Sequence, residues 1–363
     1  MATAASPHWS QRLQRAWLAR GALACALLPL AALFAAVTAL RRALYRVGFL
    51  KTRHLPVPVI VVGNLIVGGA GKTPTVLAVI ELLKRRGYTP GIVSRGHGGR
   101  HAGVLEVTDD TLASASGDEP RLLRRRSGVP VAVGRDRVAA AMQLLLGHPQ
   151  IDVLVSDDGL QHLALGRDVQ VIVFDERGVG NGWLLPAGPL REPRASAAPT
   201  RSLVVYNAAA PSVAWPGHLA RRSIGGLVSL GDWWQGRAAH ADALDALRAR
   251  PVLAAAGVAR PGRFFAMLEQ LGLRIDPLPL PDHHDYATLP WPPGTADVIV
   301  TEKDAIKLHA ERIGATRVWV APLDFALDER FDTALLALLP PPGARHGNTP
   351  AEPARLPDLQ GPA

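Results

Sequence analysis

A glycine-rich loop between a buried strand and a helix is the feature that most constrains how this chain can fold. Residues 57–63 read VPVIVVG, the pattern of a buried strand, and residues 63–74 read GNLIVGGAGKTP at the start of a predicted helix. Backbone N–H groups of such a loop surround phosphate oxygens at the helix N-terminus. Lys72 is then expected to reach the β- and γ-phosphates of a nucleotide, and the Thr73 hydroxyl to bind Mg²⁺. The motif therefore predicts a P-loop protein.

This loop departs from the usual P-loop pattern at one position. Ile66 stands where GxxxxGK[ST] has its first glycine, so later glycines must supply the backbone freedom. The structural alternative is a glycine-rich turn that binds no phosphate. The residues that we expect to bind the nucleotide are Gly68, Gly69, Ala70, Gly71, Lys72, Thr73 and Pro74.

Short apolar runs alternate with helical stretches along most of the chain. The predicted strands that follow the P-loop helix (72–87) are residues 91–94, 129–133, 152–157 and 169–175, and a second series follows at 202–206, 251–257, 296–301 and 317–321. Further helices are predicted at 135–146, 261–271 and 303–313. Strand–helix alternation predicts an α/β fold with a P-loop NTPase-type parallel sheet, helices on both faces and a second, smaller α/β lobe.

Composition shifts suggest where the parts of the chain begin and end. We expect an N-terminal membrane anchor with basic flanks at 1–50, a P-loop α/β/α domain at 51–198 and a smaller C-terminal α/β lobe at 199–339. A stretch rich in Pro and Ala near 194–200 marks the boundary between the two lobes. Residues 340–363 are rich in Pro, Gly and Ala, and we expect this tail to be disordered.

A pair of acids follows the predicted strand 152–157. Residues 156–162 read SDDGLQH, and a strand that ends in acids is where a P-loop enzyme places its Mg²⁺-binding carboxylate. Asp157 and Asp158 are the predicted metal ligands together with Thr73. Because adjacent residues at a strand end cannot both point to one place, we expect the two aspartates to have different roles. A pair of helix caps without a metal is the alternative.

Other polar clusters fall in loops between the predicted elements. They read SRGHGG at 94–99, GDEP at 117–120, GRDR at 134–137 and DHHD at 282–285. Arg95 suits contact with a phosphate. Phosphoryl transfer needs a phosphate cradle, Mg²⁺, cationic clamps and a base for the acceptor hydroxyl, and all four kinds of residue are present.

The N-terminus carries a long apolar segment. Residues 21–40 read GALACALLPLAALFAAVTAL without a charge, a length of roughly 20 residues that can cross a bilayer as a helix. Pro29 would kink this helix, which a membrane tolerates. Arginines and lysines flank the segment, with the larger excess on the C-terminal side, so the catalytic body is expected in the cytoplasm. A buried core helix and a cleaved signal peptide are the alternatives.

The bulk numbers agree with an anionic partner. The net charge is +9, which suits a phosphorylated substrate, an acidic membrane or nucleic acid, although solvated basic faces would give the same value. No platform of interleaved aromatic and basic residues is present, so nucleic acid is not expected. Cys25 is the single cysteine of the sequence, and an internal disulfide is excluded.

Nine motifs, taken together and in order, resemble the tetraacyldisaccharide 4'-kinase family, the lipid A 4'-kinases of Gram-negative bacteria. They are GNLIVGGAGKTP, SRGHGG, GDEP, VGRDR, SDDGLQH, LLPAGPLREP, AAAGVARPGRFF, DHHDY and TEKDAIKL, spread from about residue 46 to about residue 321. The resemblance implies transfer of the γ-phosphate of ATP, with Mg²⁺, to the 4'-hydroxyl of an acylated glucosamine disaccharide 1-phosphate, which forms lipid IVA. It also implies a P-loop α/β/α domain joined to a smaller lobe.

The resemblance assigns further roles to individual residues. Lys72 becomes catalytic, and Asp118 resembles the catalytic base, paired with His283 in preference to His284. His97 stands where many members carry a tyrosine. The positions that resemble substrate-lining residues are Arg95, His97, Arg137, Gln161, His162 and Glu192.

These roles place the protein at the cytoplasmic face of the bacterial inner membrane, in contact with anionic lipids. No obligate protein partner is inferred. The main alternative is a membrane-associated nucleotide switch, either a GTPase or a partition-type ATPase. A guanine switch should carry an NKxD-type motif, and TEKD at 301–304 has its lysine one position late. A soluble metabolite kinase would leave the apolar N-terminus unexplained.

Overall fold

The computed structural model describes residues 7–345, and the chain divides into two compact units. Unit 1 comprises residues 1–94, 137–220 and 327–363, and unit 2 comprises residues 95–136 and 221–326. The predicted lobes, 51–198 and 199–339, were continuous stretches, whereas each of these units is built from separate ones. Residues 346–363 of the predicted tail and 1–6 of the predicted anchor lie outside the described residues.

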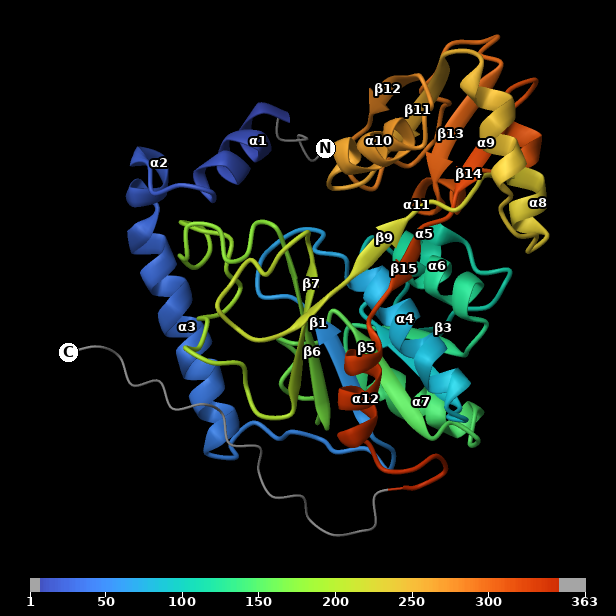
Figure 1. Cartoon of the computed structure of the whole chain (residues 1–363). Coiled ribbons are helices and arrows are strands. Elements are labelled where there is room, and N and C mark those ends of the chain that lie inside the picture. The colour runs from blue at the N-terminus through green and yellow to red at the C-terminus, as the bar shows by residue number, and fades with distance from the viewer. Residues whose placement is uncertain (1–6, 346–363) are drawn as a thin grey trace. The chain divides into compact units, whose positions relative to one another are not determined.

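Unit 1 contains a parallel sheet whose strands follow the order β2-β5-β1-β6-β7-β8. Figure 1 labels β1, β5, β6 and β7 of this sheet. These strands are β1 (Val59–Gly63), β2 (Pro90–Ser94), β5 (Val153–Asp157), β6 (Val169–Asp175), β7 (Ser202–Asn207) and β8 (His218–Leu219). Every residue of β1, β2 and β5 is buried, as in a parallel sheet that is covered on both faces. The predicted α/β class is confirmed. Val62 pairs with Asp157, so the P-loop and the acidic pair leave the same edge of the sheet.

Three helices of unit 1 pack against this sheet. They are α4 (Lys72–Arg85), α7 (Arg137–Gly147) and α12 (Glu329–Ala337). Helix α4 contacts β1, β2 and β5, whereas α7 contacts β2 and α12 contacts β7. The buried residues of α4 include a stripe with helical spacing, formed by Val76, Val79, Ile80 and Leu83.

The N-terminal segment of unit 1 forms three helices, α1 (Pro7–Ala16), α2 (Ala22–Ala26) and α3 (Leu28–Arg46). The helix is interrupted at Leu27, between α2 and α3. Pro29 therefore lies in the first turn of α3, where a backbone N–H has no partner within the helix. Among the described residues, α3 is the one helix whose length and composition would let it cross a membrane. It continues six residues past Leu40, the end of the predicted segment.

Unit 2 is built around a five-stranded sheet in the order β10-β14-β13-β11-β12. The strands are β10 (Val228–Ser229), β11 (Val252–Ala256), β12 (Ile275–Pro279), β13 (Asp297–Thr301) and β14 (Arg317–Ala321), and β10 alone of these runs antiparallel to its neighbour. Two antiparallel pairs join β3 (Val104–Glu106) to β4 (Val131–Gly134) and β9 (Arg221–Ser223) to β15 (Asp324–Ala326). The helices are α5 (Ala113–Ser116), α6 (Asp118–Ser127), α8 (Leu230–Trp234), α9 (Ala241–Arg248), α10 (Pro261–Gln270) and α11 (Glu302–Ala305).

The predicted helix at 303–313 is wrong. Helix α11 ends at Ala305, and only a 3₁₀ turn follows, at Ala310–Arg312. Ile306 and Leu308 are both buried in the same core cluster of unit 2. A continuous α-helix would turn these two side chains about 200° apart. Burial of both in one core therefore overrides the local helical preference.

Candidate active site

The P-loop of unit 1 joins β1 to α4 and depends on glycine at its last position. Gly71 has a φ of 96°, in the left-handed region. A Cβ atom at Gly71 would lie 2.0 Å from Nδ2 of Asn207, at the end of β7. The same Nδ2 donates a hydrogen bond of 2.9 Å to the carbonyl of Ala70. Gly71 is thus the residue that lets Asn207 fasten the loop.

Two more side chains that the sequence did not single out hold the P-loop. Asn64, directly after β1, donates to the Gly68 carbonyl at 3.1 Å. Arg177 donates to the Val67 carbonyl at 3.2 Å, and its guanidinium is paired with Asp175 at the end of β6 at 2.8 Å. Asn64, Arg177 and Asn207 all lie at or just beyond strand ends. Ligands of parallel sheets bind at the carboxyl ends of the strands, so a position at a strand end was the sequence signal that could have identified these residues.

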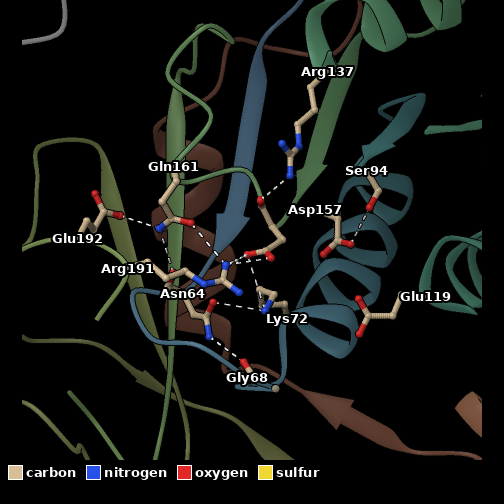
Figure 2. A network of polar contacts seen from close by, with 12 residues as sticks. Asn64, Gly68, Lys72, Ser94, Glu119, Arg137, Asp157, Gln161, Arg191 and Glu192 are labelled. Atoms are coloured by element: carbon tan, nitrogen blue, oxygen red, sulfur yellow. Dashed lines mark hydrogen bonds and ion pairs between the residues drawn. The ribbon is translucent and has the colours of Figure 1, made fainter. Parts of the chain in front are cut away.

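Lys72, the first residue of α4, is turned toward the polar groups that follow the strands. Its Nζ donates to Oδ1 of Asn64 at 3.3 Å and lies 3.7 Å from Oδ1 of Asp158. The side chain is 10% exposed. Thr73, the next residue, is buried in the first turn of the helix. Figure 2 shows Lys72 and Asn64 in one polar network.

Asp157 and Asp158 have different surroundings, as their adjacency at a strand end predicts. Asp157 is buried, and its Oδ2 accepts a hydrogen bond from Ser94 Oγ at 3.1 Å. Asp158 has a φ of 49° and binds different partners. Arg191 donates to both carboxylate oxygens of Asp158, at 2.9 and 3.0 Å. Arg191 is a site residue that the sequence reading missed.

Cations keep Asp158 ionised. Burial by itself would raise the pKa of this carboxyl, but the charges of Lys72 and Arg191 outweigh burial and hold the pKa below its ordinary value. Arg137 is buried and donates to the backbone carbonyl of Asp158 at 2.8 Å.

Two further predicted residues, Gln161 and Glu192, lie beside this network. Gln161 Nε2 donates to Oε1 of Glu192 at 2.8 Å and to the Asn64 carbonyl at 3.2 Å (Figure 2). The backbone carbonyl of His162 accepts a hydrogen bond from Arg167 at 2.9 Å. Unit 1 therefore brings Lys72, Asp158, Gln161 and Glu192 together around the P-loop.

The oxygen donors of this site suit Mg²⁺. They are the Thr73 hydroxyl and the carboxylates of Asp157 and Asp158, and Mg²⁺ prefers hard oxygen ligands. Among the residues that the structure describes, no three His, Cys, Asp or Glu side chains gather as a metal cage. Mg²⁺ in nucleotide enzymes typically takes one or two carboxylates together with substrate phosphates, which fits these donors.

Unit 2 contains the predicted Asp–His pair. Asp118 begins α6, and its buried carboxylate faces Nδ1 of His283, at 3.0 Å from Oδ1 and 2.9 Å from Oδ2. Gly117, just before it, has a φ of 93°, and a Cβ there would lie 2.4 Å from the His97 carbonyl. The glycine of GDEP thus allows the SRGHGG loop to pack against the start of α6. His284 turns instead to Tyr286, with ring centroids 4.8 Å apart.

The charges around Asp118 favour an ionised pair. Burial would raise the pKa of Asp118, but the hydrogen bond with His283 and the charges of Lys303 and Lys307 lower it to about 2. The same hydrogen bond raises the pKa of His283 above its ordinary value. The Nζ atom of Lys307 lies 3.7 Å from Oδ2 of Asp118. Both shifts favour the form of the pair in which Asp118 is a carboxylate and His283 is protonated.

Two predicted substrate residues of unit 2 lie on its surface. The His97 ring meets the His283 ring edge to face, with centroids 5.9 Å apart. Arg95 and His97 are both exposed and accessible to a ligand. His97 therefore lies beside the Asp118–His283 pair.

Comparison with known proteins identifies the family. The model of the family described as Tetraacyldisaccharide-1-P 4'-kinase matches residues 23–340. The tetraacyldisaccharide 4'-kinase of Leptothrix cholodnii is 60% identical over 333 residues, covering 91% of this chain and 96% of the relative. The corresponding protein of Methylibium petroleiphilum is 55% identical over 339 residues, covering 90% and 94%.

A solved structure agrees with these relatives. The "apo" form of LpxK from Aquifex aeolicus in complex with ATP superposes with a TM-score of 0.71 at 30% identity, covering 87% of this chain and 99% of that chain. The family match spans both the P-loop unit and the unit with the Asp–His pair. This chain belongs to the tetraacyldisaccharide-1-phosphate 4'-kinase family.

Proposed function

We propose that the protein transfers the γ-phosphate of ATP to the 4'-hydroxyl of a tetraacylated glucosamine disaccharide 1-phosphate, the lipid A precursor. The observation that carries this proposal is a P-loop lysine, Lys72, held between Asn64 and Asp158 in a chain that matches the kinase family from residue 23 to residue 340. A nucleotide switch, the alternative drawn from the sequence, is not favoured by any relative named here.

The residues of unit 1 bind and polarise ATP in this proposal. Lys72 contacts the β- and γ-phosphates, where charge develops in the loose transition state of phosphoryl transfer. Backbone N–H groups of residues 68–73 surround the phosphates. Thr73, Asp157 and Asp158 would hold Mg²⁺, which when bound would offset the negative charge of the phosphates.

The Asp118–His283 pair of unit 2 serves the acceptor. The 4'-oxygen attacks the γ-phosphorus, the bond from phosphorus to the β–γ bridging oxygen breaks, and the hydroxyl proton passes to the carboxylate of Asp118. Aspartate performs this step in protein kinases. His283 orients the carboxylate through its Nδ1–H and, when protonated, offsets negative charge during transfer.

The remaining predicted residues are assigned to substrate binding. Arg95 and His97 are exposed and available to the sugar or its phosphate. Gln161 and Glu192 lie near the P-loop network, His162 follows Gln161 in the chain, and Arg137 acts through the backbone of Asp158.

We place the protein at the cytoplasmic face of the inner membrane, where its acylated substrate partitions and ATP is available. Helix α3 exposes Leu30, Leu33, Val37 and Leu40, which suits contact with lipid tails. Basic residues around this helix would contact anionic lipid head groups. The proposal includes no nucleic acid and no obligate protein partner.

The test is direct transfer of label. Purified protein is incubated with γ-labelled ATP, Mg²⁺ and the disaccharide 1-phosphate, and the lipid fraction is examined. A labelled lipid in the parent and its loss in Lys72→Ala, with Lys84→Ala on the same helix as the matched control, is the expected result. If the parent hydrolyses ATP without labelling the lipid, the proposed acceptor is wrong.

A further inference from the structure

Helix α3 is tied to the rest of unit 1 by an arginine in its last turns. Of its 19 residues, Ala31 is buried. Arg42 nevertheless pairs with Glu192, and these two side chains are only 19% and 16% exposed. A side chain covered to that extent faces the protein, whereas the neighbouring Arg41 is exposed. Arg42 thus differs from the other basic residues that flank the apolar segment.

From Glu192 the polar contacts continue to the acid beside the P-loop. Glu192 Oε1 accepts from Gln161 Nε2 at 2.8 Å, and Gln161 Oε1 accepts from Arg191 at 3.5 Å. Arg191 donates to both oxygens of Asp158. Figure 2 shows Glu192, Gln161 and Arg191 in this succession. We name Arg42, Glu192, Gln161, Arg191 and Asp158 the anchor relay.

Charges alternate along the anchor relay. Arg42 faces Glu192, and Arg191 faces Asp158, whose Oδ1 lies 3.7 Å from Nζ of Lys72. If Arg42 were neutral, Glu192 would keep a largely buried charge without its partner. The next cation along the relay is Arg191. Attraction between the unpaired Glu192 carboxylate and Arg191 would weaken the hydrogen bonds from Arg191 to Asp158.

We propose that Arg42 is a positioning residue for the ATP site, acting through Glu192 and Arg191 on Asp158. This inference rests on the proposed role of Asp158 in binding Mg²⁺ and ATP. It links the seating of α3 in the bilayer to the geometry of the ATP site. Because linkage is reciprocal, bound ATP should in turn steady the end of α3.

The experiment compares single and paired charge removal in the full chain, in micelles of a neutral detergent. The variants are Arg42→Gln, Glu192→Gln, the double variant, Arg42→Lys and the matched control Arg41→Gln, and Lys72→Ala serves as the control for the ATP site. Binding of a fluorescent ATP analogue, mant-ATP, is measured with Mg²⁺ and without the lipid substrate. Hydrogen exchange of residues 157–163 is measured in the same proteins without nucleotide, and melting temperature reports global stability.

The expected result is a loss confined to the relay. Arg42→Gln and Glu192→Gln each raise the Kd for mant-ATP about tenfold. The double variant is no worse than the poorer single one, because no unpaired charge is left. Arg42→Lys keeps the charge and stays within about threefold of the parent, and Arg41→Gln within about twofold. Residues 157–163 exchange faster in Arg42→Gln than in Arg41→Gln.

Two results would overturn the proposal. One is an Arg42→Gln variant that matches Arg41→Gln in both mant-ATP binding and local exchange. The other is faster exchange throughout the sheet of unit 1 without recovery in Arg42→Lys, which would make Arg42 a general stabilising residue.

If Lys72→Ala binds mant-ATP as the parent does, the proposed ATP site is wrong. The exchange comparison needs no nucleotide and still decides the relay.

Discussion

Asp118 and His283 are separated by 165 residues in the chain, yet Nδ1 of the imidazole lies 2.9 Å from Oδ2 of the carboxylate. The first begins helix α6 and the second lies in the turn after β12. His283 has a φ of 60°, a left-handed conformation that a non-glycine residue adopts at some cost. A strained residue that completes a hydrogen-bonded charge pair is a candidate for function in its own right.

If the pair works as one unit, Asp118→Ala and His283→Ala should be non-additive in turnover. Each single variant is expected to lose about 10²–10⁴ in rate, and the double variant little more than the poorer single one. His284→Ala is the matched control because its ring faces Tyr286. Turnover and melting temperature are measured across the cycle. Effects that multiply, together with lowered melting temperatures, would mean that both residues are structural.

The raised pKa of His283 makes a prediction about stability and pH. The hydrogen bond with Asp118 raises this pKa above the ordinary 6.5, so folding favours the imidazolium. The stabilisation is complete below about pH 6.5, the pKa in the unfolded chain, and is lost as pH rises through the folded-state pKa. The difference in melting temperature between parent and His283→Ala should therefore be largest near pH 6 and shrink toward pH 9.

NMR titration of the histidine side chains measures the pKa of His283 directly. The pKa of His283 in the parent should exceed 6.5, and Asp118→Asn should lower it because the negative partner is removed. A value at or below 6.5 in the parent would contradict the ion pair.

Substitution at Gly71 should damage the P-loop more than substitution at a comparable glycine. Gly71 and Gly87 both have positive φ, at 96° and 83°, so alanine costs about 1–2 kcal/mol at either position. At Gly71 the new Cβ also meets Asn207, whereas Gly87 faces open space. Overpacking adds about 1–3 kcal/mol. Chemical denaturation and mant-ATP binding should show a larger loss for Gly71→Ala, and equal losses would refute the close contact.

Removal of residues up to Leu40 should release the protein from membranes. The deletion takes away the exposed apolar side chains of α3, among them Leu30, Leu33 and Val37. Fractionation is performed at low and high salt, since the remaining basic residues would hold the truncated protein only at low salt. A truncated protein that still sediments with membranes at high salt would reveal a second anchoring surface.

The sequence predicted the part of the site that rests on local patterns. A glycine-rich loop between strand and helix indicated Lys72 and Thr73, and the acids after the next central strand indicated Asp157 and Asp158. Parallel pairing of β1 with β5 then brings these segments to one edge of the sheet. The prediction of a helix at 303–313 was wrong because Ile306 and Leu308 are buried in the same core. Local helix propensity carries no information about that tertiary packing.

Residues that act across the fold were not found from local patterns. Asn207 and Arg177 hold the P-loop from strand ends far along the chain, and neither sits in a recognisable motif. The pairing of Asp118 with His283 came from the family resemblance, since spacing alone cannot bring two loops 165 residues apart together. No sequence pattern indicated the contact between Arg42 and Glu192, because basic residues beside an apolar segment ordinarily indicate contact with lipid head groups.

The position of helix α12 in the chain determines when the core of unit 1 can be completed during synthesis. Unit 1 has the apolar helix α3 in its N-terminal segment but is completed by α12, whose Phe331 and Leu335 are fully buried and which contacts β7. Unit 2 ends at residue 326, so all of its residues are synthesised before α12 begins at Glu329. The nascent chain can therefore engage the bilayer while the core beneath β7 is still open. A ribosome that stalls near residue 326 would leave a membrane-bound chain with an uncovered sheet, a substrate for chaperones and proteases.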